Sequence, residues 1–483
     1  MNLVNGDWVP VIYQNGRPAL ISLAKLFQDA ESIRDLAANP PQRIALMRLL
    51  ICIAQRSLDG PADEAEWQQC RPRIREASLS YLNEHADLFG LYGDRPFMQV
   101  PTLKPTHNAV LDKLDFGLAS GNNATLFDHA ASADGRNHSD AWIAVMLLTY
   151  LANSPGGKIG VTKWGDSSTQ PGKNKGPGES EHAPCVDCSA LHAFIRRADL
   201  LSTIHANLIA KDTADNLPNM SWGKPTWEID RSQRDSADLH QSVTTYLGRL
   251  VPLTRAILLE KNCRTFTLAN GINYPKFPEC RETSATVAAK RDGGSAYVST
   301  SLDRHPWREL GSLLAFGTNE GGPLCLQHLR RQREEGTIDI WTGGLAADKG
   351  KILDTAEWSF AAPLHMIGND GPLAEYRGGV ARAQKAQDAL DWAVKDYASA
   401  LKMEKAPKPK ARIHFWSMLD RHYDILLSTA NSDEMSLDDE WTPLLREAMR
   451  DAYQVACPCE TPRQIQAYAA GQKRLKLANM KNR

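Results

Sequence analysis

The segment "ARAQKAQDALDWAVKDYASALKM" (residues 381–403) places apolar side chains at the three- and four-residue intervals of one helix face. Further segments with this spacing follow after short polar connections, at 411–429, 438–456 and 462–483. Helices of this kind with modest connections favour an antiparallel four-helix bundle. We therefore expect a C-terminal four-helix bundle over residues 374–483, with a domain boundary after residue 373.

The preceding region, residues 1–373, mixes strand and helix patterns. The stretches "NLVNGDWVPVI" (2–12) and "NGRPALISLAKLF" (15–27) are typical of two short strands joined by an Asn-Gly turn and followed by a helix. Residues 141–151 have the pattern of a helix, whereas "RTFTLANGINYPKF" (264–277) has strand character. The predicted fold class is therefore α+β, with a large mixed α/β N-terminal domain followed by the bundle.

Three other stretches of this region have weaker patterns. Residues 104–140 contain few periodic segments and many Gly, Asn, Asp and Ser residues, so we expect a long surface loop there. The stretch "ALHAFIRRADLLSTIHANLI" (190–209) predicts a helix. The stretch "WTGGLAADKGKIL" (341–353) predicts a glycine-containing loop.

The composition describes an ordinary globular protein. The chain has 483 residues, of which 42% are hydrophobic and 23% charged, and a formal net charge of −1. No apolar run reaches the roughly 18 residues of a membrane span, and the N-terminus lacks a signal-peptide pattern, so we expect a cytoplasmic protein. The nine cysteines are few and odd in number, which favours reduced thiols over a disulfide framework.

The glycine-rich stretch "NSPGGKIGVTKWGD" (153–166) is a candidate for phosphate contact. It is no nucleotide-binding P-loop, because the glycine and lysine spacing differs and the preceding segment has the pattern of a helix rather than a strand. A plain loop and a polyanion contact both remain open. The motifs of serine hydrolases, zincins, kinases and dinucleotide-binding domains are missing from the sequence.

A zinc-like spacing occurs once, at Cys185 and Cys188, with His182 and His192 nearby. The second ligand pair of a structural zinc site is missing, and the spacing of Cys457 and Cys459 is too tight for it. We therefore expect neither a bound metal nor a cofactor. The alternative is a stand-alone metal-dependent nucleic-acid-processing enzyme that uses the Cys185 region.

Several landmarks follow one another in an order found in a known family. They are "MNLVNGDWVPV" (1–11), "RPFMQ" (95–99), "SGNNATLF" (120–127), a helix followed by "NSPGGKIG" (153–160), "PTWE" (225–228), the Gly343–Gly344 pair and the C-terminal helices. With these landmarks the chain resembles the large subunit of the type I-E CRISPR surveillance complex, the CasA family of Cascade. The resemblance extends along almost the whole chain.

The resemblance implies a subunit without catalytic activity that acts in antiviral defence. Its partners would be the guide RNA, the backbone, small and 5′-handle-binding subunits of Cascade, double-stranded DNA and a helicase-nuclease, with no membrane. It would recognise the protospacer-adjacent motif in duplex DNA, start unwinding and R-loop formation, and help recruit the helicase-nuclease. Base pairing with the guide reads most of the target, so the protein itself needs to read only a short flanking duplex.

The resemblance also assigns residues to the contacts with the motif. The glycine loop that enters the minor groove corresponds to Gly156, Gly157, Lys158, Ile159 and Gly160. Glycine suits a groove only about 6 Å wide, because it lets the backbone approach the base edges. Lys158 and Ile159 depart from the small residues of the family pattern. The basic finger corresponds to Arg264, with Lys261 as a rival.

Two further segments receive roles by resemblance. The wedge that separates the first base pairs corresponds to Asp348, Lys349 and Gly350, with lysine in place of the family's glutamine. Alternatively, Lys349 is an ordinary exposed loop residue. The segment that contacts the guide's 5′ handle and neighbouring subunits corresponds to Asn122, Asn123 and Phe127, although Phe127 equally fits a core anchor of the loop.

Overall fold

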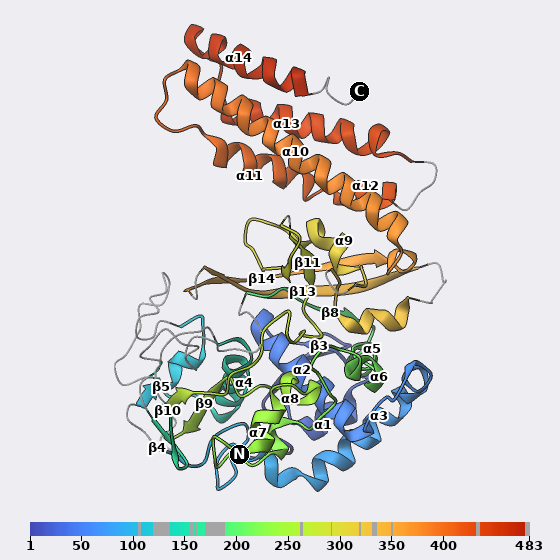
Figure 1. Cartoon of the computed structure of the whole chain (residues 1–483), viewed down its shortest axis with the longest axis vertical. Helices are drawn as coiled ribbons and strands as arrows, with labels where there is room; N and C mark the ends of the chain where they lie inside the picture. The colour runs from blue at the N-terminus through green and yellow to red at the C-terminus, as the bar shows by residue number, and fades with distance from the viewer. Residues whose placement is uncertain are drawn as a thin grey trace. The chain divides into compact units, whose positions relative to one another are not determined.

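The computed structural model describes all residues except 105–107, 119–135, 155–158, 160–161, 170–188, 261–263, 291, 318–319, 331–335, 349–350, 431–434 and 479–483. The chain forms two compact units (Figure 1). The N-terminal unit comprises Met1–Leu302 and Phe316–Leu364, and the C-terminal unit comprises Asp303–Ala315 and His365–Arg483.

A small antiparallel sheet opens the N-terminal unit, with the strand order β2-β1-β3. Its elements are β1 (Val9–Tyr13), β2 (Pro18–Ile21), α1 (Leu23–Asp29) and β3 (Ile33–Leu36). Gly16 between β1 and β2 has a φ of +81°, which a side chain would strain. The predicted pair of strands with an Asn-Gly turn and a following helix is confirmed.

Three longer helices contribute much of the core of this unit: α2 (Pro40–Leu58), α3 (Glu64–Glu84) and α4 (Asp140–Asn153). A capping box between Asn39 and Gln42 starts α2, and Pro40 occupies its first turn. Buried residues run along most of α2 and α4 rather than along one stripe, so protein surrounds both helices. The helix predicted at 141–151 is confirmed as α4.

Short strands and helices complete the N-terminal unit. The strand orders are β5-β10-β9, β11-β12, β14-β13-β8 and β4-β6-β7. The strands are β4 (Leu103–Lys104), β5 (Asn108–Val110), β6 (Thr162–Trp164), β7 (Ser167–Thr169), β8 (His192–Arg196), β9 (Arg255–Leu259), β10 (Thr265–Asn270), β11 (Val287–Ala289), β12 (Ser295–Tyr297), β13 (Thr337–Asp348) and β14 (Lys351–Pro363). The short helices are α5 (Leu200–Ala206), α6 (Lys211–Asp215), α7 (Ala237–Ser242) and α8 (Tyr246–Leu250), with 3₁₀ turns η1 (Ala86–Phe89), η2 (Leu111–Leu114), η3 (Thr226–Glu228) and η5 (Leu324–Leu329).

The structure corrects three of the weaker sequence predictions. Residues 190–209 form strand β8 and then α5 rather than one helix. Residues 341–353 belong to the long hairpin of β13 and β14 rather than to a loop. The stretch at 104–140, predicted to be a loop, contains β5, which pairs with β10. Strands β5 and β8 pair with strands from distant parts of the chain, and β13 pairs with β8 in addition to β14. A local pattern does not reveal pairing with a distant strand.

The C-terminal unit is helical, as predicted. Its elements are η4 (Pro306–Glu309), α9 (Leu310–Leu313), α10 (Asp370–Ala400), α11 (Lys408–Leu419), α12 (Tyr423–Ala430), the π-helical turn η7 (Leu437–Trp441), α13 (Thr442–Ala456) and α14 (Pro462–Ala478). The long α10 packs against α11, α13 and α14. The predicted segment 411–429 is divided between α11 and α12, and the position after residue 373 lies inside the continuous helix α10.

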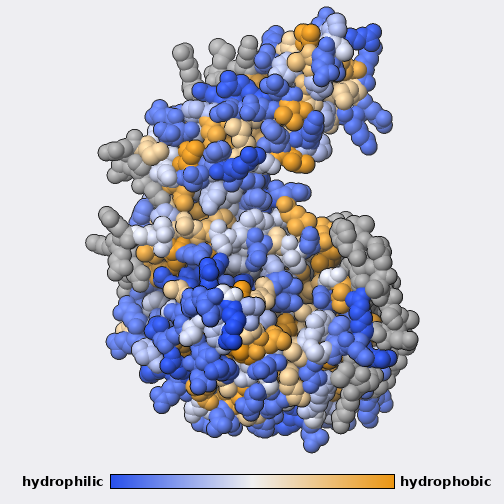
Figure 2. All heavy atoms as spheres, turned by 180° about the vertical axis from the view of Figure 1, so that it is seen from behind, coloured by the Kyte–Doolittle hydropathy of each residue, from blue (hydrophilic) through white to orange (hydrophobic). Residues whose placement is uncertain are grey.

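The face of the molecule drawn in Figure 2 is mainly polar. On the face seen in Figure 2, hydrophilic side chains predominate and hydrophobic ones are interspersed among them in small patches. Among the helices of the described residues, none combines the length and the apolar character that crossing a bilayer requires.

Candidate nucleic-acid interface

The structure describes three of the residues that the resemblance assigns to nucleic-acid or subunit contacts: Ile159, Arg264 and Asp348. The others lie outside the described residues: Gly156, Gly157, Lys158, Gly160, Lys261, Lys349, Gly350, Asn122, Asn123 and Phe127. The described residues that border these positions show how each segment is anchored.

The first anchor of the glycine segment, residues 155–161, is the end of α4. Thr254 Oγ1 donates to the carbonyl of Leu151 at 2.6 Å, which satisfies one of the carbonyls that a helix end leaves without a partner. The buried Asn153 amide donates to Pro41 O at 3.3 Å. Ser154, also buried, accepts from Arg255 Nε at 3.1 Å. The chain therefore enters the glycine segment from a fixed backbone.

The second anchor is Trp164, the last residue of β6. Its side chain is fully buried, and its indole Nε1 donates to the carbonyl of Arg231 at 2.8 Å. Strand β6 pairs on one side with β4, where Trp164 is opposite Leu103, and on the other with β7. The glycine segment is thus fixed at both ends.

Arg231 joins two of the sequence landmarks in the core. Its guanidinium donates to the carbonyls of Pro96 and Gln99 in "RPFMQ" at 3.1 and 3.0 Å. It also donates to the carbonyls of Thr226 and Trp227 in "PTWE" at 2.9 and 3.0 Å. Burial lowers the pKa of Arg231 to about 10, so the group remains charged at neutral pH.

The aromatic and acidic residues of these landmarks are also structural. Phe97 lies against Trp227, with ring centroids 5.8 Å apart, and Trp227 Nε1 donates to the Tyr81 hydroxyl at 2.8 Å. Glu228 accepts from Tyr81 at 2.6 Å and makes a two-bond contact with Arg56 at 2.8 and 2.9 Å. The landmarks therefore belong to the core of the N-terminal unit, and Arg231 connects them to Trp164. Sequence reasoning missed Arg231, because its acceptors are carbonyls that carry no residue signature.

Arg264 is exposed and directly precedes β10. Its backbone carbonyl accepts from Leu111 N at 2.8 Å, next to the pairing of β10 with β5. Its side-chain Nε donates to Asn137 Oδ1 at 2.7 Å. The candidate finger is therefore in contact with the residues that follow the segment 119–135, to which the resemblance gives the guide contact.

The residues on either side of Asn137 contact a buried carboxylate, that of Asp112. Asp112, 1% exposed, accepts from the backbone N of Arg136 at 3.2 Å and lies 2.7 Å from His138 Nε2. His138 stacks on Trp142 of α4 with ring centroids 3.5 Å apart. Asp112 thus holds the chain on both sides of Asn137.

In the sequence, the candidate wedge lies at the junction between the two strands of the longest hairpin that the structure describes. Strands β13 and β14 pair from Thr337 opposite Pro363 to Asp348 opposite Lys351, with a register shift after Ala346. Lys349 and Gly350 lie between the last pair and outside the described residues. β13 also pairs with β8, so this side of the hairpin is part of a larger sheet.

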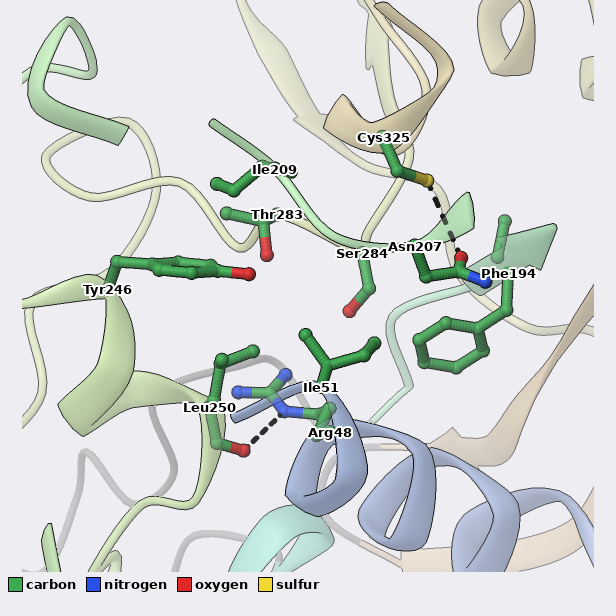
Figure 3. Close-up of a pocket in the computed structure, with 11 residues that line it drawn as sticks. Arg48, Ile51, Phe194, Asn207, Ile209, Tyr246, Leu250, Thr283, Ser284 and Cys325 are labelled. Atoms are coloured by element: carbon green, nitrogen blue, oxygen red, sulfur yellow. Dashed lines mark hydrogen bonds between the residues drawn. The ribbon is translucent and has the colours of Figure 1, made fainter. Parts of the chain in front are cut away.

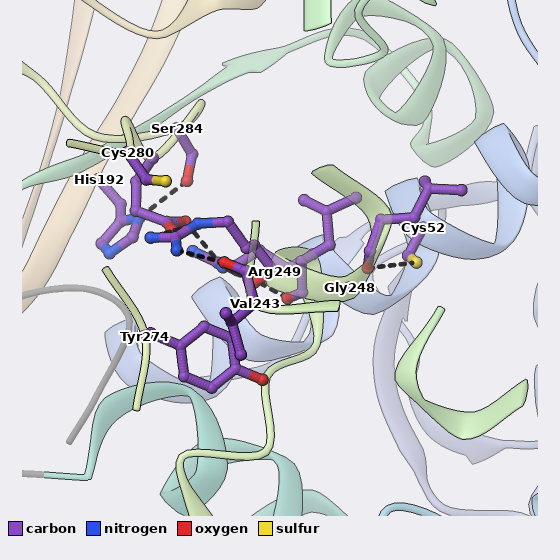
Figure 4. A network of polar contacts seen from close by, with 12 residues as sticks. Cys52, His192, Val243, Gly248, Arg249, Tyr274, Cys280 and Ser284 are labelled. Carbon is purple, nitrogen blue, oxygen red and sulfur yellow. Dashed lines mark hydrogen bonds and ion pairs between the residues drawn. The ribbon is translucent and has the colours of Figure 1, made fainter. Parts of the chain in front are cut away.

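A buried ionic network that includes Arg249 lies in the core of the N-terminal unit (Figure 4). Glu282 contacts Arg48 at 2.9 Å and Arg249 at 2.7 Å, and all three side chains are 2–3% exposed. Burial alone would raise the pKa of Glu282, but the two guanidinium groups lower it overall. The network connects α2, α8 and the segment of Glu282, and it has the character of a structural element rather than a surface site.

A small cavity adjoins this network (Figure 3). Arg48, Phe194, Asn207, Tyr246 and Cys325 are among its lining residues, and its interior has room for about one water molecule. Arg48 Nε donates to Leu250 O at 2.8 Å, and Cys325 Sγ lies 3.5 Å from Asn207 Oδ1. The cavity is too small to hold a nucleotide.

The zinc hypothesis depends on Cys185 and Cys188, and both lie outside the described residues. The cysteines that the structure describes are free thiols. Among the described residues, no group of three or more His, Cys, Asp or Glu side chains could hold a metal ion. His192, which lies near the cysteine pair in sequence, is committed to a hydrogen bond with Ser284 Oγ at 2.9 Å.

Comparisons with known proteins agree with this architecture. A family model described as CRISPR-associated protein Cse1 matches residues 2–457. The CRISPR-associated protein CasA/Cse1 of Thermus thermophilus is 26% identical over 388 residues, which are 76% of this chain and 72% of the relative. A crystal structure of CasA from Thermus thermophilus matches with a TM-score of 0.79 at 19% identity over 99% of each chain. A chain of a CRISPR RNA-guided surveillance complex matches with a TM-score of 0.76 at 16% identity, also over 99% of each chain.

Proposed function

Because the chain belongs to the family of CRISPR-associated protein Cse1, we propose that it is the large, non-catalytic subunit of a type I-E CRISPR RNA-guided surveillance complex. In this role it binds the guide RNA and the backbone, small and 5′-handle-binding subunits. It recognises the protospacer-adjacent motif in double-stranded DNA, initiates unwinding and R-loop formation, and helps recruit a helicase-nuclease. The fold shared with a chain of such a complex supports the proposal.

One observation carries the DNA-reading part of this proposal: both ends of the glycine segment 155–161 are anchored in the core. A loop with fixed ends loses less conformational freedom when it binds than a free loop does. Its glycines let the backbone approach base edges in the narrow minor groove. Arg264 supplies a charge for phosphate or base edges, and the β13–β14 hairpin supports the wedge at its tip.

The decisive experiment measures binding by the reconstituted, guide-loaded complex. The probe is a guide-matched duplex pool with randomised flanking bases, and the bound fraction is separated by gel shift and sequenced. We expect a short motif to be enriched. Gly157→Asp is expected to weaken binding without preventing assembly, because it adds bulk and negative charge beside the phosphates.

Gly294→Asp makes the same change at an exposed glycine of the turn between β11 and β12, and it serves as the matched control. A bound fraction without an enriched motif would reject motif recognition. Equal binding by Gly157→Asp and wild type would reject only the assignment of the glycine loop, and motif recognition by the complex would stand.

The absence of catalysis is a separate part of the proposal. We expect the isolated chain to hydrolyse neither ATP nor DNA and to carry no stoichiometric zinc. DNA cleavage together with equimolar zinc, both lost on Cys185→Ser, would favour the metal-dependent enzyme instead.

A further inference from the structure

The contact between Arg264 and Asn137 joins two segments that are far apart in the sequence. Arg264 Nε donates to Asn137 Oδ1 at 2.7 Å, and both residues are exposed. The backbone of Arg264 is fixed by the bond from Leu111 N to its carbonyl. The side chain of Arg264 is therefore directed by a surface residue that belongs to neither β10 nor its partner strands.

The neighbours of Asn137 in the sequence are held by contacts with the core. These neighbours, Arg136 and His138, both contact Asp112, which is 1% exposed, at 3.2 Å through the Arg136 backbone N and at 2.7 Å through the His138 ring. The ring of His138 is also stacked on Trp142. A buried carboxylate thus holds both neighbours of Asn137, Arg136 through its backbone N and His138 through its ring.

We propose that Asn137 is a positioning residue that holds the Arg264 guanidinium ready for contact with duplex DNA, with Asp112 as the support of Asn137. The inference rests on the proposed function. The bond to Asn137 uses Nε, so Asn137 does not occupy the terminal guanidinium nitrogens, which form the donor fork that recognises phosphate or a base edge.

The physical gain is preorganisation. A free arginine side chain has many rotamers and loses this freedom when it binds a phosphate. Holding it in one orientation beforehand removes part of that loss and strengthens binding by about three- to tenfold per side chain. The exposed hydrogen bond between Arg264 and Asn137 contributes little to the free energy of folding. Its removal should therefore leave the fold intact, and the loss should appear in DNA binding.

The test uses the reconstituted complex and the guide-matched duplex pool with randomised flanking bases. Asn137→Leu removes the acceptor at similar size, and Asn137→Gln keeps a neutral amide acceptor. Affinity is measured by fluorescence anisotropy for these variants, for Arg264→Ala and for the double variant of Asn137→Leu with Arg264→Ala. Gln69→Leu replaces an exposed amide of α3 and is the matched control.

We expect Asn137→Leu to weaken binding about three- to tenfold, and Asn137→Gln and Gln69→Leu to stay near wild type. The double variant should bind as Arg264→Ala does, because Asn137 acts only through Arg264. Wild-type affinity of Asn137→Leu beside a weakened Arg264→Ala, or additive losses in the double variant, would overturn the positioning role. Wild-type affinity of Arg264→Ala would instead reject the DNA contact of Arg264 in the proposed function.

Discussion

At the scale of single residues, Arg231 explains how two landmarks, "RPFMQ" and "PTWE", are connected in the fold. The segments lie more than a hundred positions apart, and the guanidinium joins them through backbone carbonyls of Pro96, Gln99, Thr226 and Trp227. Buried carbonyls need donors, and one arginine supplies five N–H groups. The landmarks therefore identify the fold through its core, whereas the candidate contacts with DNA come from other segments of the sequence.

Arg231→Lys tests this role. Lysine keeps the charge but offers a compact ammonium in place of the planar fork, so several buried carbonyls lose their donors. We expect the free energy of unfolding in urea to fall by about 3 kcal/mol, since each unpaired buried group costs roughly 1–3 kcal/mol. Arg95→Lys changes an exposed arginine of the same landmark, and it should have little effect. Equal stability of the two variants would show that Arg231 is dispensable.

His192 predicts how the stability of the chain depends on pH. Burial, and to a smaller extent Arg48, lowers the pKa of His192 to about 3 against an opposing effect of Glu282, so the folded chain keeps the ring neutral. The unfolded chain takes up a proton near its ordinary pKa of about 6.5, so stability is lost as the pH falls from 6.5 toward 3. At pH 5 the loss from this group should be about 2 kcal/mol relative to pH 7.

The measurement is the free energy of unfolding at pH 7 and pH 5 for wild type, His192→Gln and His240→Gln. In His192→Gln, the free energy of unfolding should differ between pH 7 and pH 5 by about 2 kcal/mol less than in wild type. His240 is 51% exposed, and His240→Gln is the matched control. If the free energy of unfolding changed between pH 7 and pH 5 by the same amount in wild type and His192→Gln, His192 would not cause the loss of stability at low pH.

At the scale of elements, the β13–β14 hairpin shows where sequence patterns fail. The glycines of "WTGG" indicate a loop, yet they lie within strand β13. A Cβ on Gly343 would come within 2.6 Å of the Trp341 ring, and one on Gly344 within 2.8 Å of the Ala190 carbonyl. The close approach of the Trp341 ring and of the Ala190 backbone requires these glycines, and only the folded structure reveals these contacts.

Other elements follow the same division between local and distant causes. The helix α4 was predictable because its apolar residues are contiguous and Ser139 caps its start. Strand β8 was not, because all but the last of its residues are buried and such a run fits a helix as well. In the candidate interface, Arg264 is assigned by the resemblance, whereas no motif describes its contact with Asn137 or the contact of Asp112 with His138.

The hairpin also carries a prediction about strand separation. If Lys349 acts at its tip as a wedge, Lys349→Ala should slow R-loop formation on paired DNA about tenfold, because holding open one base step is worth on the order of 1.4 kcal/mol. A target already mismatched beside the motif should restore the rate. Lys349→Gln should retain most activity, since the steric part of the wedge remains.

The rates on paired and pre-opened duplexes are followed with a fluorescent base analogue beside the motif. Equal defects of Lys349→Ala on both substrates would place the residue in docking or phosphate contact. Wild-type rates on both would make Lys349 an ordinary exposed residue of the hairpin.

At the scale of the whole molecule, the two compact units are not two consecutive pieces of chain. Residues 303–315 leave the N-terminal unit and join the C-terminal unit, long before its main helices begin. There Trp307, 1% exposed, donates from Nε1 to Asp420 at 2.7 Å and accepts from the Tyr376 hydroxyl at 2.8 Å through its carbonyl. A boundary drawn from helical periodicity alone omits this tryptophan, because a short inserted segment has no period of its own.

Trp307 is therefore expected to stabilise a unit from which it is distant in sequence. Trp307→Ala should destabilise the C-terminal unit by about 3–5 kcal/mol, the range for removing a large buried aromatic side chain. Hydrogen exchange of the full chain checks this, because protection should fall in peptides of α10, α11 and α13 and remain in α2 and α4. Trp392 of α10 is 52% exposed, and Trp392→Ala provides the matched control in the same unit. Equal protection of α10, α11 and α13 in the two variants would mean that the inserted segment only decorates the bundle, and a fragment of residues 374–483 would then fold as stably as the unit in the full chain.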